Sequence, residues 1–221
     1  MNTERFDVYT VVHKGLRKAL FDLGYAIGRT DAENDAELDA LRIQCAEVLH
    51  FLDEHGENEN RYQLALLEQK CPGAASHNFE EHEEIEAMVR NLESRLQAVV
   101  EAPHKQRRPM LRAYYGLYHK FVSRYLLHME EEETETTKLL HEYCTDEELA
   151  EQTQKIIQRT PPADMGMMLK YMIPSMNGPE RIKLLGEMKQ GAPPEAFHGV
   201  KALAQQVLHP GEWAGIEQGI A

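Results

Sequence analysis

Apolar residues recur at spacings of three and four along most of the first 143 residues, which is the period of an amphipathic α-helix. No stretch shows a sustained period of two, so we expect no β-strands. Four apolar series run through residues 6–27, 38–66, 79–99 and 110–139, with glycine, proline and polar residues between them. Four amphipathic helices with short connections predict an all-α protein whose main part is an up-down-up-down four-helix bundle.

The pattern changes beyond residue 144, where prolines cut the chain into pieces of about 10 to 15 residues. We therefore expect two domains, a four-helix bundle at 1–143 and a helical C-terminal extension of short helices at 144–221, packed on the bundle. Local signals place some helix starts: Ser76 is a candidate N-cap, and Thr145 with Glu148 forms a capping-box pattern. Residues 103–109 are predicted to form a basic connector between the third and fourth helices.

Polar side chains interrupt the apolar stripe of every predicted helix of the bundle. Burying imidazoles and carboxylates in a bundle core costs several kcal/mol unless another group satisfies them. A bound metal satisfies both, because neutral imidazole nitrogens and carboxylate oxygens are metal ligands. The candidate ligands are His13 on the first helix, His55 and Glu59 on the second, His82 on the third, and His128 and Glu132 on the fourth.

Spacing and height support a single site. The pairs His55/Glu59 and His128/Glu132 are separated by four residues, so the two side chains of each pair project from the same helix face. In an up-down-up-down bundle with a rise of about 1.5 Å per residue, all four sets lie at a similar height. The remaining histidines fall on other faces, in connectors or in the extension; they are His50, His77, His104, His119, His141, His198 and His209.

The donor set narrows the choice of metal. Nitrogen and oxygen ligands without thiolates suit iron, manganese, zinc or copper. Four imidazoles and two carboxylates exceed what one ion needs, which points to two ions. Iron is the usual metal of carboxylate-bridged pairs in bundle cores.

These six residues, one set on each helix, resemble the ligand pattern of the hemerythrin-like (HHE cation-binding) family. The strings EHEEI at 81–85 and LLHMEEEE at 126–133 are also similar to that family, and the resemblance covers about residues 1–143. It implies an oxo- or hydroxo-bridged non-heme diiron centre. Glu59 and Glu132 would bridge the two irons, and the histidines would be terminal ligands.

One position departs from the oxygen-carrying hemerythrins, which have a fifth histidine four residues before the one matched by His82. Asn78 occupies that position here. The set of four histidines and two glutamates resembles bacterial relatives linked to nitric oxide stress and iron handling, and the iron-sensing branch. The departure argues against reversible oxygen carriage and implies an additional coordination position for a small ligand.

Composition and charge make some partners and cellular locations less favourable than others. The formal net charge is −13, which disfavours nucleic acid and anionic membranes as partners. Three scattered cysteines, Cys45, Cys71 and Cys144, fit a reducing compartment rather than a disulfide framework. The first residues lack the basic end and apolar run of a secretion signal, so we expect a cytoplasmic protein.

The predicted function is binding of dioxygen, nitric oxide or peroxide at a diiron centre, for sensing, storage or detoxification. Two alternatives remain open: a diiron peroxidase or nitric oxide reductase, and an iron-dependent regulatory protein that contacts a protein partner through residues 144–221. Near the candidate ligands, Tyr62 and Tyr125 are core residues, hydrogen-bond partners of the ligands or targets of oxidation. Glu86 is either a solvated side chain or a further ligand or acceptor.

Overall fold

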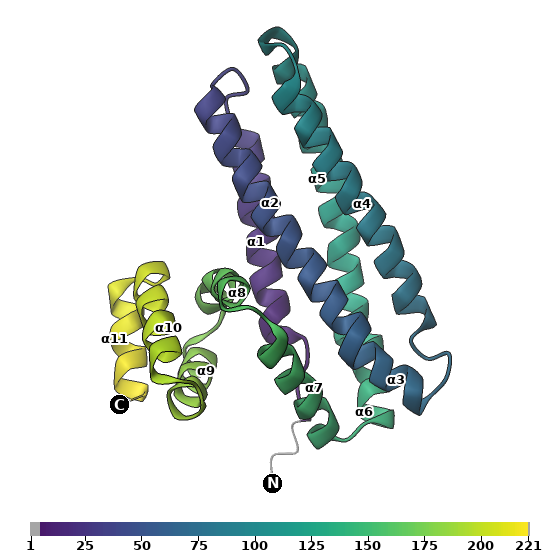
Figure 1. The fold of residues 1–221 in the computed structure, drawn as a ribbon, viewed down its shortest axis with the longest axis vertical. Helices are drawn as coiled ribbons and strands as arrows, with labels where there is room; N and C mark the ends of the chain where they lie inside the picture. The colour runs from purple at the N-terminus through teal and green to yellow at the C-terminus, as the bar shows by residue number, and fades with distance from the viewer. Residues whose placement is uncertain (1–4, 221) are drawn as a thin grey trace. The chain divides into compact units, whose positions relative to one another are not determined.

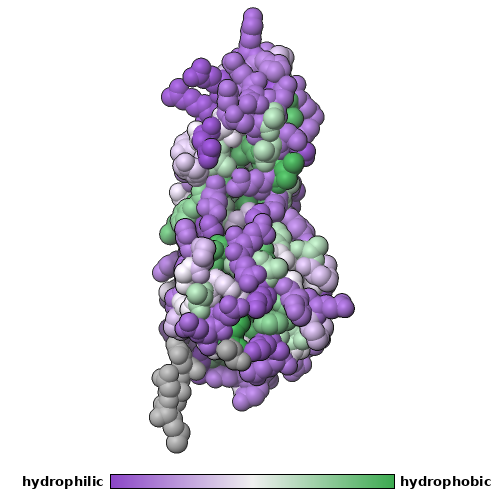
Figure 2. All heavy atoms as spheres, turned by 90° about the vertical axis from the view of Figure 1, so that its left-hand side faces the viewer, coloured by the Kyte–Doolittle hydropathy of each residue, from purple (hydrophilic) through white to green (hydrophobic). Residues whose placement is uncertain are grey.

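The structure, a computed structural model, describes residues 5–220 and is almost entirely helical in that range (Figure 1). No β-strand occurs among these residues, so the predicted all-α class is confirmed. Charged and polar side chains dominate the face drawn in Figure 2, as expected for a chain with 37 acidic and 24 basic residues. The helices are α1 (Thr10–Arg29), α2 (Asp35–Asn58), α3 (Leu64–Lys70), α4 (Ser76–Glu101), α5 (His104–Glu131), α6 (Thr137–Tyr143), α7 (Asp146–Arg159), α8 (Pro162–Ser175), α9 (Gly178–Gly191), α10 (Pro194–Val207) and α11 (Pro210–Gly219).

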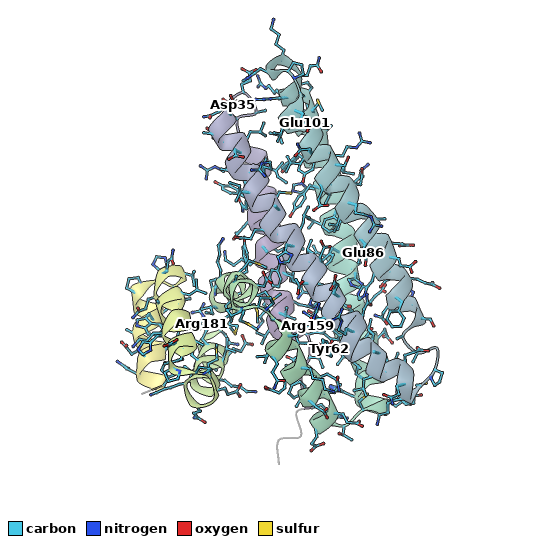
Figure 3. All side chains as sticks on the ribbon, viewed as in Figure 1. Asp35, Tyr62, Glu86, Glu101, Arg159 and Arg181 are labelled. Carbon is cyan, nitrogen blue, oxygen red and sulfur yellow. The ribbon has the colours of Figure 1, made fainter. Side chains whose placement is uncertain are left out.

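The described residues pack into two compact units. The first contains residues 5–9 and 19–159, and the second contains residues 10–18 and 160–220. This division differs from the predicted boundary between residues 143 and 144, because α7 belongs to the first unit. Polar contacts tie α7 to the first unit: Lys70 pairs with Glu148, and the guanidinium of Arg159 donates to Asn58 Oδ1 at 3.0 Å. Figure 3 labels Arg159.

In the first unit, α4 packs against both α2 and α5 (Figure 1). Residues 19–29 of α1 contact α5, where the Tyr118 hydroxyl donates to the Leu20 carbonyl at 2.8 Å. Gly24 permits this close approach, since a Cβ at that position would lie 3.3 Å from Tyr118 Cε1. The core consists of the apolar positions of the predicted series, including Leu20, Leu23, Leu41, Val48, Val89, Leu92, Leu96 and Phe121.

Two long helices contain a short π-helical segment that the sequence pattern did not reveal. Residues Glu59–Gln63 connect α2 to α3, and residues Glu132–Thr136 connect α5 to α6. Each segment begins at a predicted glutamate ligand. A π turn widens the helix by one residue and is uncommon, but it occurs frequently at functional sites.

Helix starts agree in part with the sequence signals. The capping box at α7 is confirmed, because Glu148 N donates to Thr145 Oγ1 and Thr145 N donates to Glu148 Oε2. The N-cap expected at Ser76 is wrong by one residue, since Ala75 is the N-cap and Ser76 is already helical. The connector expected at 103–109 is also wrong: α5 begins at His104 and includes Pro109.

The second unit consists of short helices, as the prolines predicted. Proline stands at the first or second position of α8, α9, α10 and α11, where its missing N–H costs nothing. Trp213 is buried within this unit's own core. Arg181 is buried there too and donates to the carbonyls of Ile173 and Pro174, and to Glu212 (Figure 3).

Within residues 5–220, no helix combines the length and apolar composition that crossing a membrane would require.

Candidate metal centre

Five of the six predicted ligands lie in the first unit, within its core and next to the apolar cluster that includes Leu64, Leu67 and Leu140. His55 lies in the last turn of α2, His82 in α4 and His128 in the last turn of α5. Glu59 and Glu132 are the first residues of the two π-helical segments. All five are buried, with exposed fractions between 0% for Glu132 and 6% for His55.

The structure brings these five side chains together. One ligand atom from each of Glu59, His82, His128 and Glu132 lies within 4.8 Å of all the others, and His55 approaches both carboxylates within the same limit. Glu59 contacts two rings with different oxygens: Oε1 lies 3.0 Å from His55 Nε2, and Oε2 lies 3.4 Å from His82 Nε2. Glu132 Oε1 lies 3.4 Å from His82 Nε2 and 3.3 Å from His128 Nε2. Each carboxylate therefore faces two imidazoles.

His13, the sixth predicted ligand, is fully buried in α1. It lies in the part of α1 that belongs to the second unit, residues 10–18. Its role as a ligand stays a prediction from the sequence.

Polar neighbours hold the outer nitrogen of two rings. His82 Nδ1 lies 2.6 Å from Asn60 Oδ1, and His128 Nδ1 lies 3.1 Å from Glu81 Oε2. Glu81 is itself paired with the Arg124 guanidinium. An oxygen acceptor at Nδ1 places the proton there and leaves the Nε2 lone pair facing inward, as in most histidine metal ligands.

The two inward nitrogens meet at the centre of the group. His82 Nε2 and His128 Nε2 are 3.2 Å apart, and the ring planes cross at 76°. With both Nδ1 atoms protonated, two lone pairs face each other beside two carboxylates. Such an arrangement requires a cation, either a proton or a metal ion, and the donor set therefore fits a metal.

The electrostatics favour positive charge at the same place. Burial acts to lower the pKa of His82, but the hydrogen bonds and charges of Glu132 and Glu59 outweigh it and raise the pKa to about 10. Burial acts to raise the pKa of Glu59, but His55 and His82 hold it well below its usual range. The Glu59 carboxylate thus stays ionised and stabilises a cation that lies beside it.

Several neighbours of the centre differ from expectation or were not identified. Glu81 on α4 orients the His128 ring of α5, and Asn60 on the π-helical segment orients the His82 ring of α4; the helical period of the sequence does not reveal such contacts between segments. Asn78 is buried, and its side-chain amide donates to Thr136 Oγ1 at 2.9 Å, so a hydrogen bond within the core already satisfies it. Glu86 is exposed and pairs with Arg90 at 3.2 Å, which agrees with a solvated side chain.

The two tyrosines near the ligands differ in environment. Tyr125 is buried, with its ring centroid 5.6 Å from that of His128. Burial, together with the charges of Glu59 and Glu132, raises the pKa of Tyr125 well above its usual value, so it remains a neutral hydroxyl. Tyr62, which Figure 3 labels, is only half-buried.

A second group of possible ligands lies at the surface. His77 Nε2 is 3.2 Å from Glu131 Oε2 and 3.8 Å from Glu81 Oε2. The His77 side chain is 70% exposed, and Arg124 already neutralises Glu81. This group is a weaker cation site than the buried one.

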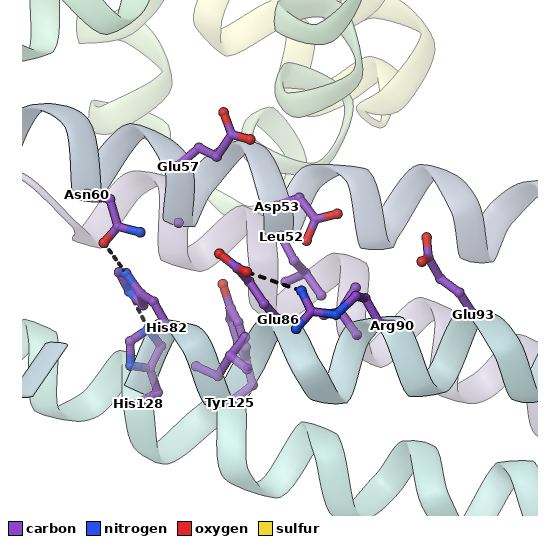
Figure 4. A pocket seen from close by; sticks show the side chains of 13 residues that line it. Leu52, Asp53, Glu57, Asn60, His82, Glu86, Arg90, Glu93, Tyr125 and His128 are labelled. Atoms are coloured by element: carbon purple, nitrogen blue, oxygen red, sulfur yellow. Dashed lines mark hydrogen bonds and ion pairs between the residues drawn. The ribbon is translucent and has the colours of Figure 1, made fainter. Parts of the chain in front are cut away.

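A cavity of about 250 Å³ opens between α2 and α4 and reaches the centre. Its inner wall includes His82, His128 and Tyr125, and its outer wall carries Asp53 and Glu86 (Figure 4). The centre is therefore buried but not sealed.

Comparisons with protein-family models, with curated proteins and with solved structures found no match for this chain.

Proposed function

We propose that the first unit, with His13, is a hemerythrin-like domain that holds two iron ions and binds a small oxidant, namely dioxygen, nitric oxide or peroxide. The role would be sensing, storage or detoxification. One observation carries the proposal: the Nε2 atoms of His82 and His128 face each other and two buried carboxylates, with both Nδ1 atoms held by oxygens. This geometry is the one that ligating imidazoles adopt.

Each ligand has a definite task in the proposal. Glu59 and Glu132 would each help to hold both ions, because each faces two imidazoles. His55, His82 and His128 would be further ligands, and His13 would complete the set of four histidines. A bound iron pair would supply a reversible change of oxidation state and would bind the oxidant.

The protein residues supply the rest. Glu81 and Asn60 fix the rings of His128 and His82, so that no reorganisation is needed when a metal enters. Burial of Glu59 and Glu132 removes water that would otherwise screen their charges. Asn78 is a poor iron ligand and is held by Thr136, which supports a set of four rather than five histidines.

The finer features of the fold belong to the same proposal. We propose that α1, α2–α3, α4 and α5–α6 form an up-down-up-down four-helix bundle. The packing of α4 on α2 and α5, and of residues 19–29 on α5, supports this arrangement. We place the protein in the cytoplasm, where its three cysteines, all free thiols, would stay reduced.

Metal content tests the proposal. Purified protein loaded with ferrous iron under anaerobic conditions is expected to retain two irons per chain, and exposure to air should give visible absorption bands that a zinc-loaded sample lacks. A His82→Ala/His128→Ala variant should lose most of the iron. His119→Ala is the matched control, because His119 is an exposed histidine of the same helix as His128. Equal iron content in the wild type and the double variant would refute the proposal.

The role of His13 has its own test. A His13→Ala variant is expected to bind less than the full two irons or to bind one of them more weakly, because one ion would lose a terminal ligand. A variant that retains both irons with unchanged affinity would remove His13 from the set and leave the other five ligands in place.

A further inference from the structure

The cavity between α2 and α4 is the feature of the first unit that the proposed function leaves unexplained. It measures about 250 Å³, and its floor is formed by His82 and His128, two of the proposed ligands. Both histidines are more than nine-tenths buried, so the cavity is a passage from the surface to otherwise inaccessible groups. A divalent ion with six waters occupies roughly 180 Å³ at ~30 Å³ per water, which this space can hold.

Negative charge dominates the wall of the cavity. Asp53, Glu57, Glu86 and Glu93 line it, against a single guanidinium, that of Arg90. Arg90 pairs with Glu86 at 3.2 Å, so its charge is already used within the wall. The remaining carboxylates give the passage a net negative field.

Two of these carboxylates have no partner within the described range. Asp53 and Glu93 make no hydrogen bond or ion pair with residues 5–220, and Figure 4 shows them along the same groove as Glu86. Carboxylates crowded in this way are stabilised by a passing cation.

A buried hydroxyl also faces the passage. Tyr125 is 2% exposed, and its hydroxyl makes no hydrogen bond to any residue in the described part of the chain. Figure 4 shows its oxygen directed into the cavity, between Glu86 and the two histidines. A hydroxyl oxygen that lines the cavity without a hydrogen-bond partner in the described part of the chain can accept a hydrogen bond from the waters of a hydrated ion, or contact the ion itself.

We propose that this cavity is the entry route by which a divalent metal ion, ferrous iron in the proposed function, reaches the buried centre. The carboxylates of Asp53, Glu86 and Glu93 attract the hydrated cation, and the Tyr125 hydroxyl receives it before His82 and His128. The same field repels anions. The inference rests on the proposed function and adds the path and the charge selectivity of loading.

The test measures the rate of iron uptake, with ferrous iron alone as the probe under anaerobic conditions. Unbound iron is trapped by a colorimetric chelator at timed intervals. An Asp53→Asn/Glu86→Gln/Glu93→Gln variant is expected to load roughly ten-fold more slowly, because clefts of one charge sign raise association rates by 10-fold or more. Its final iron content should equal that of the wild type. Added salt should slow the wild type more than the variant.

The matched control removes the same charge elsewhere. Glu33→Gln/Glu80→Gln/Glu130→Gln changes three exposed carboxylates that do not line the cavity. This variant should load at close to the wild-type rate. Equal slowing of the two triple variants would attribute the effect to overall charge and overturn the proposal.

A second variant tests the path without changing charge. Gly56 lines the cavity and has nothing within 4 Å of an added Cβ, so Gly56→Leu should fill the passage without a clash. Gly116→Leu is its control, because Gly116 is also helical, equally open, and remote from the cavity. We expect slow uptake only for Gly56→Leu, at every salt concentration.

The outcomes separate the two proposals. Wild-type protein that takes up no iron overturns the proposed function and the entry route together. Wild-type protein that takes up iron at a rate that neither the acidic triple variant nor Gly56→Leu changes overturns the entry route alone.

Discussion

Two regions of the first unit are built from the same three helices, α2, α4 and α5, but their cores differ in polarity. Apolar and aromatic side chains fill the core where α5 begins. Polar groups enter the core where α5 ends, next to the apolar cluster of Leu64, Leu67 and Leu140. We call them the apolar end (Leu41, Cys45, Leu92, Leu96 and Tyr114) and the metal end (His55, Glu59, His82, His128 and Glu132). Each fully buried apolar side chain contributes roughly 1.5–3 kcal/mol, whereas each buried charge costs several kcal/mol unless paired. The apolar end thus raises the free energy of unfolding, and the buried charges of the metal end lower it unless they are paired.

Polar groups at the two ends are satisfied differently. At the apolar end, Cys45 Sγ and the Tyr114 hydroxyl lie 3.2 Å apart and satisfy each other. Burial raises the pKa of Cys45 to about 11, so the thiol stays neutral. At the metal end, oxygen atoms hold the outer nitrogens of His82 and His128, and the inner nitrogens face each other and the carboxylates of Glu59 and Glu132. The first pattern is complete without a ligand, and the second needs a cation.

The largest expected effect comes from the apolar end. Leu92→Ala removes a 1% exposed side chain of α4 and leaves a cavity, which should lower the free energy of unfolding by roughly 3 to 5 kcal/mol. Urea unfolding of metal-free protein measures this loss. Iron content per folded chain should not change, because Leu92 lies about ten residues from His82 along α4. A variant that loses iron as well as stability would show that the two ends are not independent.

Metal binding should act in the opposite direction at the other end. Iron that binds only the folded protein raises its stability by about 2.7 kcal/mol when free metal is 100 times Kd. Thermal unfolding with and without ferrous iron measures the gain. In Leu92→Ala, iron should raise the stability by the same amount as in the wild type, although the metal-free variant is less stable. In His82→Ala/His128→Ala, iron should raise the stability little. An equal gain in the double variant would place the stabilising ion elsewhere.

A smaller effect is expected from a residue that touches a ligand rather than the metal. Glu81→Ala removes the acceptor of His128 Nδ1, and loss of such a partner weakens metal binding by roughly 10- to 100-fold. Chelator competition gives the Kd, and Glu81→Gln should recover part of the affinity. Glu80→Ala is the control, because Glu80 is an exposed neighbour. Unchanged affinity in Glu81→Ala would leave Glu81 with no role beyond its ion pair with Arg124.

The sequence predicted the helices and the members of the polar group for one physical reason. Apolar residues repeat at the helical period, so an imidazole or carboxylate on that stripe, such as His82 or Glu132, must enter the core. The structure places five of the six side chains together, as the shared face and height require. Their chemistry as metal ligands remains a prediction.

Other features could not be predicted, because they depend on contacts between helices. Glu81 orients a ring on α5 from α4, and a helix pattern contains no information about that neighbour. The π-helical segments beginning at Glu59 and Glu132 are changes of backbone hydrogen bonding within continuous helices. The assignment of α7 to the first unit follows from single pairs such as Lys70 with Glu148. Local periodicity cannot supply any of these.

The smallest predicted effect tests whether iron binding depends on the stability of the metal end or on the orientation of its ligand rings. Thr145→Ala removes the N-cap hydroxyl of α7, whose Arg159 contacts Asn58 near the metal end, and should cost about 1 kcal/mol of unfolding free energy. Thr153→Ala, the same substitution within α7, is the control and should cost less, because its hydroxyl only donates to the Leu149 carbonyl of its own helix. Neither variant should change iron content or affinity. If Thr145→Ala weakened iron binding as strongly as Glu81→Ala, binding would follow the stability of the whole metal end rather than the orientation of its rings.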